Sequence, residues 1–147
     1  MLADPQYAIT EGRALAEDLM TDTCVITRPG TVPVTDPDTG VVTTPEVVVY
    51  PDPAWPEDHP WKHGPCKVQA NEAQEMTDDV GESEQTVQRY RLDVPVGSLV
   101  PRIGYAATIT PADTALDPFL VGHRFRVVAL LHKSQATAYR LGVKQEV

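Results

Sequence analysis

The chain has 147 residues, of which 41% are hydrophobic, with 14 prolines, 9 glycines and a formal net charge of −9. This length allows one domain around one hydrophobic core and excludes two, and the many prolines and glycines favour β structure with extended loops over long helices. The acidic balance argues against a general binder of duplex DNA, because neutralisation of phosphates supplies most of that affinity.

The charges are divided unevenly along the chain. Residues 1–84 hold 17 acidic and 4 basic side chains, whereas residues 85–147 hold 4 acidic and 8 basic ones. Such polarity suits head-to-tail contact between identical subunits, in which the acidic part of one meets the basic part of the next. A single acidic loop that dominates the count explains the same numbers equally well.

The sequence shows no evident signal peptide and no evident membrane-spanning segment. No stretch approaches the ~20 apolar residues that span a bilayer, and the N-terminus lacks a basic region followed by an apolar run. We expect a soluble protein with no membrane partner. Cys24 and Cys66 lie in apolar, strand-like contexts and are interpreted as buried, reduced thiols.

The chain is predicted to begin with a helix over residues 5–20. Asp4 is a suitable N-cap, and Pro5 fits the first helical position, where its missing N–H costs nothing. One face collects the residues at three-to-four spacing, namely Ile9, Gly12, Leu15, Ala16, Leu19 and Met20. Because an isolated helix of this length is marginal in water, this face must pack on the domain or on a neighbouring chain.

Seven short strands are predicted after the helix. Asp36–Gly40 is a turn in which Pro37 fixes φ and Gly40 accepts a positive φ, so the first two strands should form a hairpin with a wide loop. We therefore predict a mainly β fold, a small barrel or sandwich, in a single domain 1–147 with loops at residues 51–65 and 71–84. The strands are expected at residues 23–27, 41–50, 66–70, 86–96, 105–110, 124–131 and 136–143.

The predicted loop over residues 71–84 is strongly acidic. It contains six carboxylates and no lysine or arginine, which is typical of a mobile, solvated loop or of a segment that only a partner orders. We treat it as a candidate partner-contact segment. Its acidic residues are Glu72, Glu75, Asp78, Asp79, Glu82 and Glu84.

Five arginines lie on the predicted strands, and alternation places Arg124 and Arg126 on one sheet face. They could contact phosphates or the carboxylates of a neighbouring subunit. The low aromatic content of 6% leaves few side chains on which nucleic-acid bases could stack, so an inter-subunit face is the favoured interpretation. Its candidate residues are Arg89, Arg91, Arg124, Arg126 and Arg140.

Catalytic and metal-binding patterns are weak. His59, His63 and Cys66 have residue types that bind zinc, but a structural site needs a fourth ligand, and Trp55 and Trp61 suggest a loop that covers an apolar edge instead. No nucleophile elbow, P-loop or zinc-protease motif is present. We expect neither an enzyme nor a bound metal or cofactor.

Several strand and turn patterns together resemble the head-to-tail connector proteins of phages that infect actinobacteria, and more distantly the stopper, or head-closure, proteins of long-tailed phages. The resemblance extends over most of the chain from Ala14 onward. Its patterns are Asp38-Thr39-Gly40, Gly64-Pro65-Cys66-Lys67-Val68-Gln69, Tyr90-Arg91-Leu92-Asp93-Val94-Pro95-Val96, Ile103-Gly104, Leu116-Asp117-Pro118, residues 120–127 and Thr137-Ala138-Tyr139-Arg140-Leu141.

This resemblance implies a β-barrel subunit of a ring, with six copies favoured over twelve, in the neck of the virion. It also implies portal or adaptor proteins on the head side, tail-terminator or tail-tube proteins on the tail side, and packaged duplex DNA that passes without sequence-specific binding. The acidic segment would then be a lumen or gate element, because carboxylates repel phosphate across a Debye length of ~8 Å. The Pro- and Trp-rich residues 51–61 depart from the family pattern as an insertion, and the long acidic segment departs from it as well.

Three alternatives stay open. The chain could be an adaptor or a tail-terminator subunit of the same connector, and a mostly helical fold would indicate the adaptor. It could be a stand-alone acidic module that binds a basic host protein, which would be a monomer. A metal-dependent enzyme that uses His59, His63 and Cys66 would require stoichiometric metal.

Overall fold

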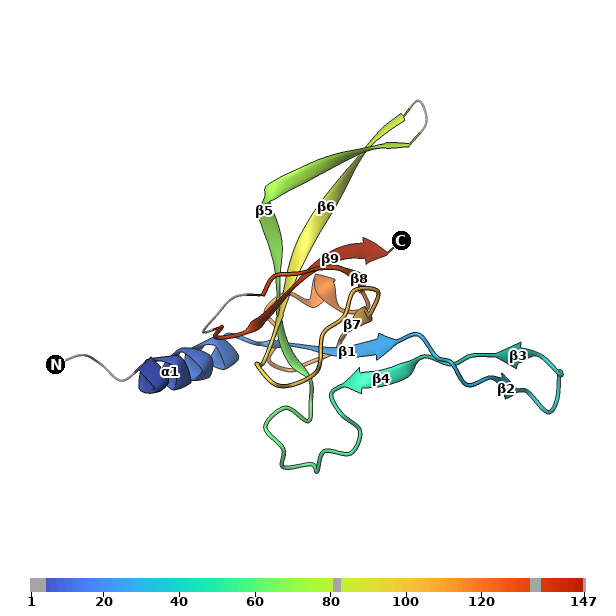
Figure 1. Cartoon of the computed structure of the whole chain (residues 1–147), viewed down its shortest axis with the longest axis horizontal. Coiled ribbons are helices and arrows are strands. Elements are labelled where there is room, and N and C mark those ends of the chain that lie inside the picture. Colours follow the sequence, from blue (N-terminus) through green and yellow to red (C-terminus); the bar gives the residue numbers. More distant parts are fainter. Residues whose placement is uncertain (1–4, 81–82, 133–135, 147) are drawn as a thin grey trace.

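A closed barrel of six antiparallel strands forms the centre of the molecule (Figure 1). The computed structural model describes residues 5–80, 83–132 and 136–146. The barrel order is β1-β5-β6-β9-β8-β7, and β7 returns to β1. The prediction of a mainly β fold with an N-terminal helix and long loops is thus confirmed. Its strands are β1 (Asp22–Arg28), β5 (Pro65–Val80), β6 (Ser83–Val94), β7 (Ala106–Thr110), β8 (Arg124–Leu130) and β9 (Tyr139–Glu146).

Alternating apolar residues fill the barrel, because successive side chains of a strand point to opposite faces. The pairs Leu92/Val94, Phe125/Val127 and Leu141/Val143 each supply two inward side chains that are almost fully buried. Cys24 and Cys66 are free thiols inside this core, as predicted. The other members of the core cluster are Ile26, Tyr50, Ala107 and Ile109.

Strand β1 closes the barrel by pairing on both of its edges. One edge pairs with β7 from Thr23↔Thr110 to Thr27↔Ala106. The other edge meets β5 at Asp22↔Cys66 and then a seventh strand, β4 (Val47–Tyr50), from Ile26↔Tyr50 onward. Gly64 lies where β5 approaches β1; its φ is 72°, and a Cβ there would lie 2.3 Å from the Cys24 carbonyl oxygen.

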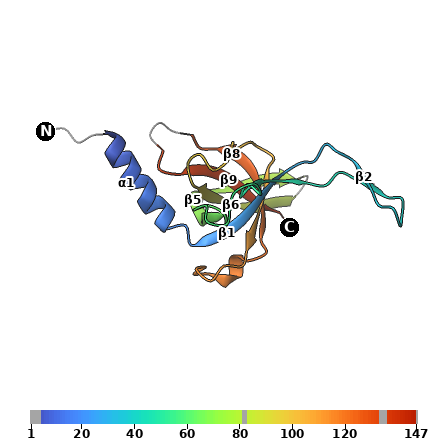
Figure 2. The ribbon, with the colours of Figure 1, turned by 90° about the horizontal axis from the view of Figure 1, so that it is seen from below.

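The helix α1 (Pro5–Asp18) projects away from the barrel (Figure 2). It is two residues shorter than predicted, and Met20 beyond its end is buried. The predicted packing face is only partly correct, because Leu15 and Leu19 stay 66% and 60% exposed. The segment before β9 approaches the helix at Gly12, where a Cβ would lie 2.9 Å from the Thr137 Cγ2 atom.

A second extension follows β1. The predicted strand over residues 41–50 is interrupted, because Pro45 has no N–H to pair. It divides into β3 (Val42–Thr43), which pairs with β2 (Val34–Thr35), and β4, which pairs with β1 as the predicted hairpin requires. The turn at residues 36–40 forms as predicted, with φ of 72° at Gly40 and a 2.8 Å hydrogen bond from the Asp38 N–H to the Asp36 carboxylate.

The backbone of residues 71–80 contradicts the loop predicted for residues 71–84. Strands β5 and β6 continue beyond the barrel as a hairpin that pairs from Glu75↔Gln88 to Val80↔Ser83, with an irregularity between Ala70 and Glu75. The loop was predicted from the charge of the segment. Pairing between strands, however, depends on backbone hydrogen bonds, which acidic residues form as well as others do. A short 3-10 helix, η1 (Pro118–Leu120), completes the elements of the described residues.

Candidate functional site

Three extensions leave the barrel in different directions, and they are the candidate contact surfaces of the molecule. Figure 1 shows α1 and the β2–β3 hairpin at opposite ends of the longest axis, with the outer parts of β5 and β6 away from both. The turned view in Figure 2 keeps α1 and the β2–β3 hairpin at opposite ends. None of the three is folded back over the barrel in these views.

The arm, defined here as residues 29–48, is apolar and uncovered. Every residue from 31 to 48 is exposed. Six of them are valines whose exposed fractions run from 37% to 70%. These valines are Val32, Val34, Val41, Val42, Val47 and Val48.

Two side-chain hydrogen bonds hold α1 to the rest of the chain. The Arg13 Nε donates to the Ala136 carbonyl oxygen over 3.2 Å, and the Trp61 indole N–H donates to the Glu17 carboxylate. Tyr7 and Leu15 of the helix stay 64% and 66% exposed. The helix is therefore anchored at Arg13 and Glu17 and keeps exposed apolar side chains elsewhere.

A cleft of about 200 Å³ separates the C-terminal end of α1 from the barrel, and we call it the helix cleft. Leu19 and Met20 form part of its apolar wall. Its charged residues are three cations, Lys67, Arg91 and Arg140, and one carboxylate, Asp93.

Asp93 is only 6% exposed, and Arg91 contacts it through two hydrogen bonds of 3.0 and 3.2 Å. Burial raises the pKa of the Asp93 carboxyl, while Arg91, Arg140 and Lys67 act in the opposite direction. The Arg140 Nε is buried and has no hydrogen-bond partner among the described residues. The cleft therefore holds more positive than negative charge, and part of it is not paired.

Two of the five arginines predicted for an inter-subunit face pair with carboxylates of their own chain. Arg124 contacts Glu46 and Glu146 at 2.5 and 2.9 Å, and Arg126 contacts Glu146 at 2.6 Å. Arg124 and Arg126 do share one sheet face, as alternation predicts. The hydrogen bond from Arg124 lowers the pKa of Glu46, and that from Arg126 lowers the pKa of Glu146.

The remaining arginines of the predicted face lie elsewhere. Arg91 and Arg140 line the helix cleft, and the buried Arg89 Nε has no hydrogen-bond partner among the described residues. The structure therefore divides the predicted basic face into two parts. In an ion-pair cluster, Arg124 and Arg126 of β8 contact Glu46, just before β4, and Glu146 of β9. In the helix cleft, Arg91 and Arg140 lie beneath the helix.

The three residues considered for zinc do not come together. The His59 ring stacks on Trp55 with centroids 4.2 Å apart, and its Nδ1 accepts from the Trp61 N–H over 3.1 Å. Cys66 lies inside the barrel, where a hydrogen bond with Cys24 and burial raise its pKa, while His63 is exposed. Within residues 5–80, 83–132 and 136–146 no three such side chains are placed to hold a metal ion.

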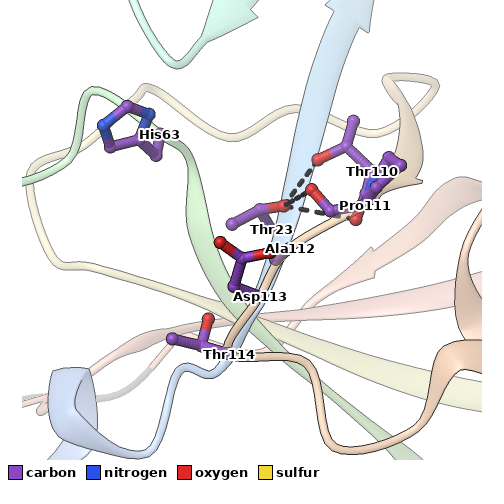
Figure 3. Close-up of a pocket in the computed structure, with 7 residues that line it drawn as sticks. All are labelled: Thr23, His63, Thr110, Pro111, Ala112, Asp113 and Thr114. Atoms are coloured by element: carbon purple, nitrogen blue, oxygen red, sulfur yellow. Dashed lines mark hydrogen bonds between the residues drawn. The ribbon is translucent and has the colours of Figure 1, made fainter.

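A larger open hollow of about 650 Å³ lies beside the start of β1 (Figure 3). The Thr23 and Thr110 hydroxyls are 2.6 Å apart, and the Thr23 hydroxyl also contacts the Thr110 carbonyl oxygen at 3.2 Å. The Thr114 hydroxyl donates to the Thr21 carbonyl oxygen over 2.8 Å. Figure 3 shows His63 apart from this cluster, so the hydroxyls hold β1 against the end of β7 rather than meeting a base.

The acidic residues predicted as a contact segment lie on the outer half of the β5–β6 hairpin. Glu72, Glu75, Asp78 and Asp79 belong to β5, and Glu84 belongs to β6. Glu82 lies outside the described residues. The backbone thus places the acidic sequence at the end of the hairpin that is farthest from the barrel (Figure 1).

One family model, described as "Family of unknown function (DUF6093)", matches residues 12–144. No curated protein and no solved structure matches the chain. Among the described helices, none is both long and apolar enough to cross a membrane.

Proposed function

Since the chain belongs to the DUF6093 family, whose function is unknown, we propose its role from its own residues: it is a structural subunit of the head-to-tail connector ring of a tailed bacteriophage. In this proposal it takes the stopper, or head-closure, position, joins the portal–adaptor side to the tail and continues the DNA channel. It is found in the neck of the virion, and in the host cytoplasm during assembly.

The observation that most supports this proposal is the uncovered apolar surface on two opposite extensions. Exposed apolar patches of several hundred Å² often mark interaction sites. The valines of the arm, Leu15 of α1 and Leu19 just after it are exposed, although the barrel core is well buried. The core of such a subunit is buried within one copy, whereas the apolar side chains at its two ends need a partner to cover them.

The patterns behind the connector resemblance also lie on the barrel. Residues 90–94 end β6, residues 124–127 begin β8, and residues 139–141 begin β9. These three strands are neighbours in the barrel order, so these three patterns cover one continuous part of the sheet. They support a shared barrel.

The acidic hairpin suits a channel through which duplex DNA must pass without being held. Carboxylates repel phosphates over roughly a Debye length, ~8 Å at physiological ionic strength. Six carboxylates within residues 72–84 would give the ring a local surface that does not bind DNA. We place this hairpin at the channel or against the adjacent ring.

The first experiment is the native mass and shape of the purified protein. Light scattering and negative-stain electron microscopy should give closed rings whose mass is six, or alternatively twelve, times 16.1 kDa. A protein that stays monomeric alone and in the presence of portal and tail proteins would contradict the proposal. It would favour the stand-alone acidic binding module instead.

The second experiment tests the acidic hairpin. Replacing its six carboxylates with the corresponding amides in the phage should leave the ring intact but reduce the fraction of particles that retain DNA. The matched control replaces Asp52, Glu57 and Asp58, which are exposed carboxylates in the irregular segment before β5. Unchanged assembly and unchanged DNA retention in the hairpin variant would count against its place in the channel.

The adaptor and the tail terminator are the closest alternatives within the same machine. An adaptor is expected to be mostly helical, and among the described residues α1 is the only α-helix. The mainly β fold therefore favours the stopper position over the adaptor. Pull-down with purified portal–adaptor complexes and with tail tubes distinguishes the stopper, which binds both, from a terminator, which binds the tail alone.

A further inference from the structure

We propose that the arm of one copy docks against the helix end of the next copy, with the turn at residues 36–40 seated in the helix cleft. The inference rests on the proposed ring and names the contact that joins its subunits. Its partner is a second copy of this chain.

Both elements are incomplete in a single copy. Strands β2 and β3 have two residues each and pair only with one another, and an isolated two-stranded hairpin is marginally stable at best in water. The helix has 14 residues, none of them buried, which is also marginal alone. A neighbour that covers both elements would stabilise the folded form of each.

The positions of the two elements favour a head-to-tail contact between copies. They lie at opposite ends of the longest axis, so the arm of one copy does not lie over its own helix (Figures 1 and 2). A heterologous contact uses a different surface on each partner and closes into a ring when its rotation allows. One kind of contact then covers both ends of every subunit.

The charges of the two surfaces are complementary. The tip of the arm presents Asp36 and Asp38, and the hydrogen bond from the Asp38 N–H lowers the pKa of the Asp36 carboxyl, which keeps it ionised. The helix cleft offers three cations against one carboxylate, and the Arg140 Nε lacks a partner. A carboxylate of the incoming tip would bring negative charge to these cations, and charge-assisted bonds of this kind are the stronger ones.

The exposed valines of the arm would supply the apolar part of this contact. The six exposed valines amount to roughly 400 Å², which is the size of the largest patch on a typical monomer and about half of what each partner gives to a standard interface. Leu19 lines the cleft and is exposed, so it provides an apolar surface for them. The acidic tip of the arm, seated in the helix cleft, supplies the polar part of the interface.

The first test is a charge reversal across copies, measured by light scattering of the purified chain. Asp38→Arg and Arg140→Glu should each weaken association at least tenfold, because each places like charges in the contact. A chain that carries both substitutions should recover most of the association, since every contact then again joins a positive and a negative side chain, with the two signs exchanged. Glu57→Arg and Arg102→Glu are the matched controls, because both residues are exposed and lie outside the arm and the cleft.

The second test does not depend on Arg140, whose replacement can affect folding. Asp38→Cys and Ala16→Cys are prepared in separate chains and treated with a short bismaleimide; the native Cys24 and Cys66 are buried and should not react. Crosslinked dimers should form in the mixture and not in either preparation alone. Crosslinking within the Asp38→Cys preparation alone would indicate an arm-to-arm contact and overturn the inference.

The remaining outcomes separate this inference from the proposed function. Rings that form but neither crosslink nor respond to Asp38→Arg overturn the inference and leave the ring proposal in place. An arm that crosslinks only to a portal or tail protein has the same consequence, because the occupant is then not a second copy. Mixed crosslinks in open filaments support the arm contact but contradict a ring, and a chain that remains monomeric with every partner contradicts both.

Discussion

Tyr50 joins three parts of the molecule through one buried side chain. It ends β4, is fully buried, and its hydroxyl donates to the Pro65 carbonyl oxygen at the start of β5 over 2.5 Å. Its ring also meets Trp55 edge to face, with centroids 6.2 Å apart. Burial raises the pKa of the Tyr50 hydroxyl, so it remains a donor at any physiological pH.

Tyr50→Phe should therefore lower the free energy of unfolding by about 1–2 kcal/mol, because the Pro65 carbonyl loses its donor while the packing is kept. Urea denaturation followed by fluorescence measures this difference. Tyr7→Phe is the matched control, since Tyr7 is 64% exposed and its change should stay within ~0.5 kcal/mol. Equal effects at the two positions would contradict the role given to the buried hydroxyl.

At the scale of elements, the ion-pair cluster connects the arm to the barrel. Glu46 precedes β4 and meets Arg124 of β8, while Glu146 of β9 meets both Arg124 and Arg126. The pKa values of Glu46 and Glu146 are lowered in the folded state, so their ionised forms favour folding. This contribution is present above the ordinary pKa of a glutamate and is lost as the pH falls through the lowered values.

Glu146→Gln should consequently flatten the dependence of stability on pH below about pH 5. The side chains of Glu46 and Glu146 are 42% and 32% exposed, so solvent screens the ion pairs and the expected difference is small, below about 1 kcal/mol. Urea midpoints measured between pH 3 and 6 provide the comparison. Glu57→Gln removes an exposed carboxylate outside this cluster and should keep the wild-type curve; a steeper curve for Glu146→Gln would refute the assignment.

The strands could be predicted where apolar and polar residues alternate regularly. Residues 86–96 and 124–131 were placed within three residues of the ends of β6 and β8, because one face of each is buried. The break at Pro45 was visible in the sequence but was outweighed by the β-branched valines on both sides. The hairpin at residues 71–80 was missed because its charge, rather than its backbone pairing, guided the prediction.

The candidate contact surfaces were less predictable because their residues are distant in sequence. Arg124 meets Glu46 across 78 positions, which no local spacing could indicate. The helix cleft combines Leu19 of the segment after α1 with Lys67 of β5 and Arg140 of β9. Sequence alone placed Arg91 and Arg140 on strands but could not place them beneath the helix.

At the scale of the whole molecule, the barrel and the arm should be separable. Replacing residues 31–44 with Asn-Gly is expected to change the free energy of unfolding by no more than about 0.5 kcal/mol, because no side chain there is buried. The same variant should lose association entirely. Circular dichroism with thermal unfolding measures the first effect, and light scattering measures the second.

A milder variant serves as the control for the arm. Val34→Thr with Val42→Thr keeps the length and the β-branching of the arm but removes part of its apolar surface. Association should weaken less than in the shortened chain. If shortening the arm unfolds the barrel, the two parts are not independent and the assignment of the arm to assembly loses its basis.

The closure of the barrel also has a consequence for the time course of biosynthesis. Strand β1 is synthesised early, but residues 25–27 of it pair with Thr108 to Ala106 of β7, which is synthesised much later. Strand β6 likewise pairs with the later strand β9, for example at Val94↔Tyr139. Contacts between such distant residues slow folding, so a nascent chain still on the ribosome keeps sheet edges unpaired until its last strand is synthesised. Truncated translation products would then expose those edges to proteases, whereas chains that have reached β9 would resist them.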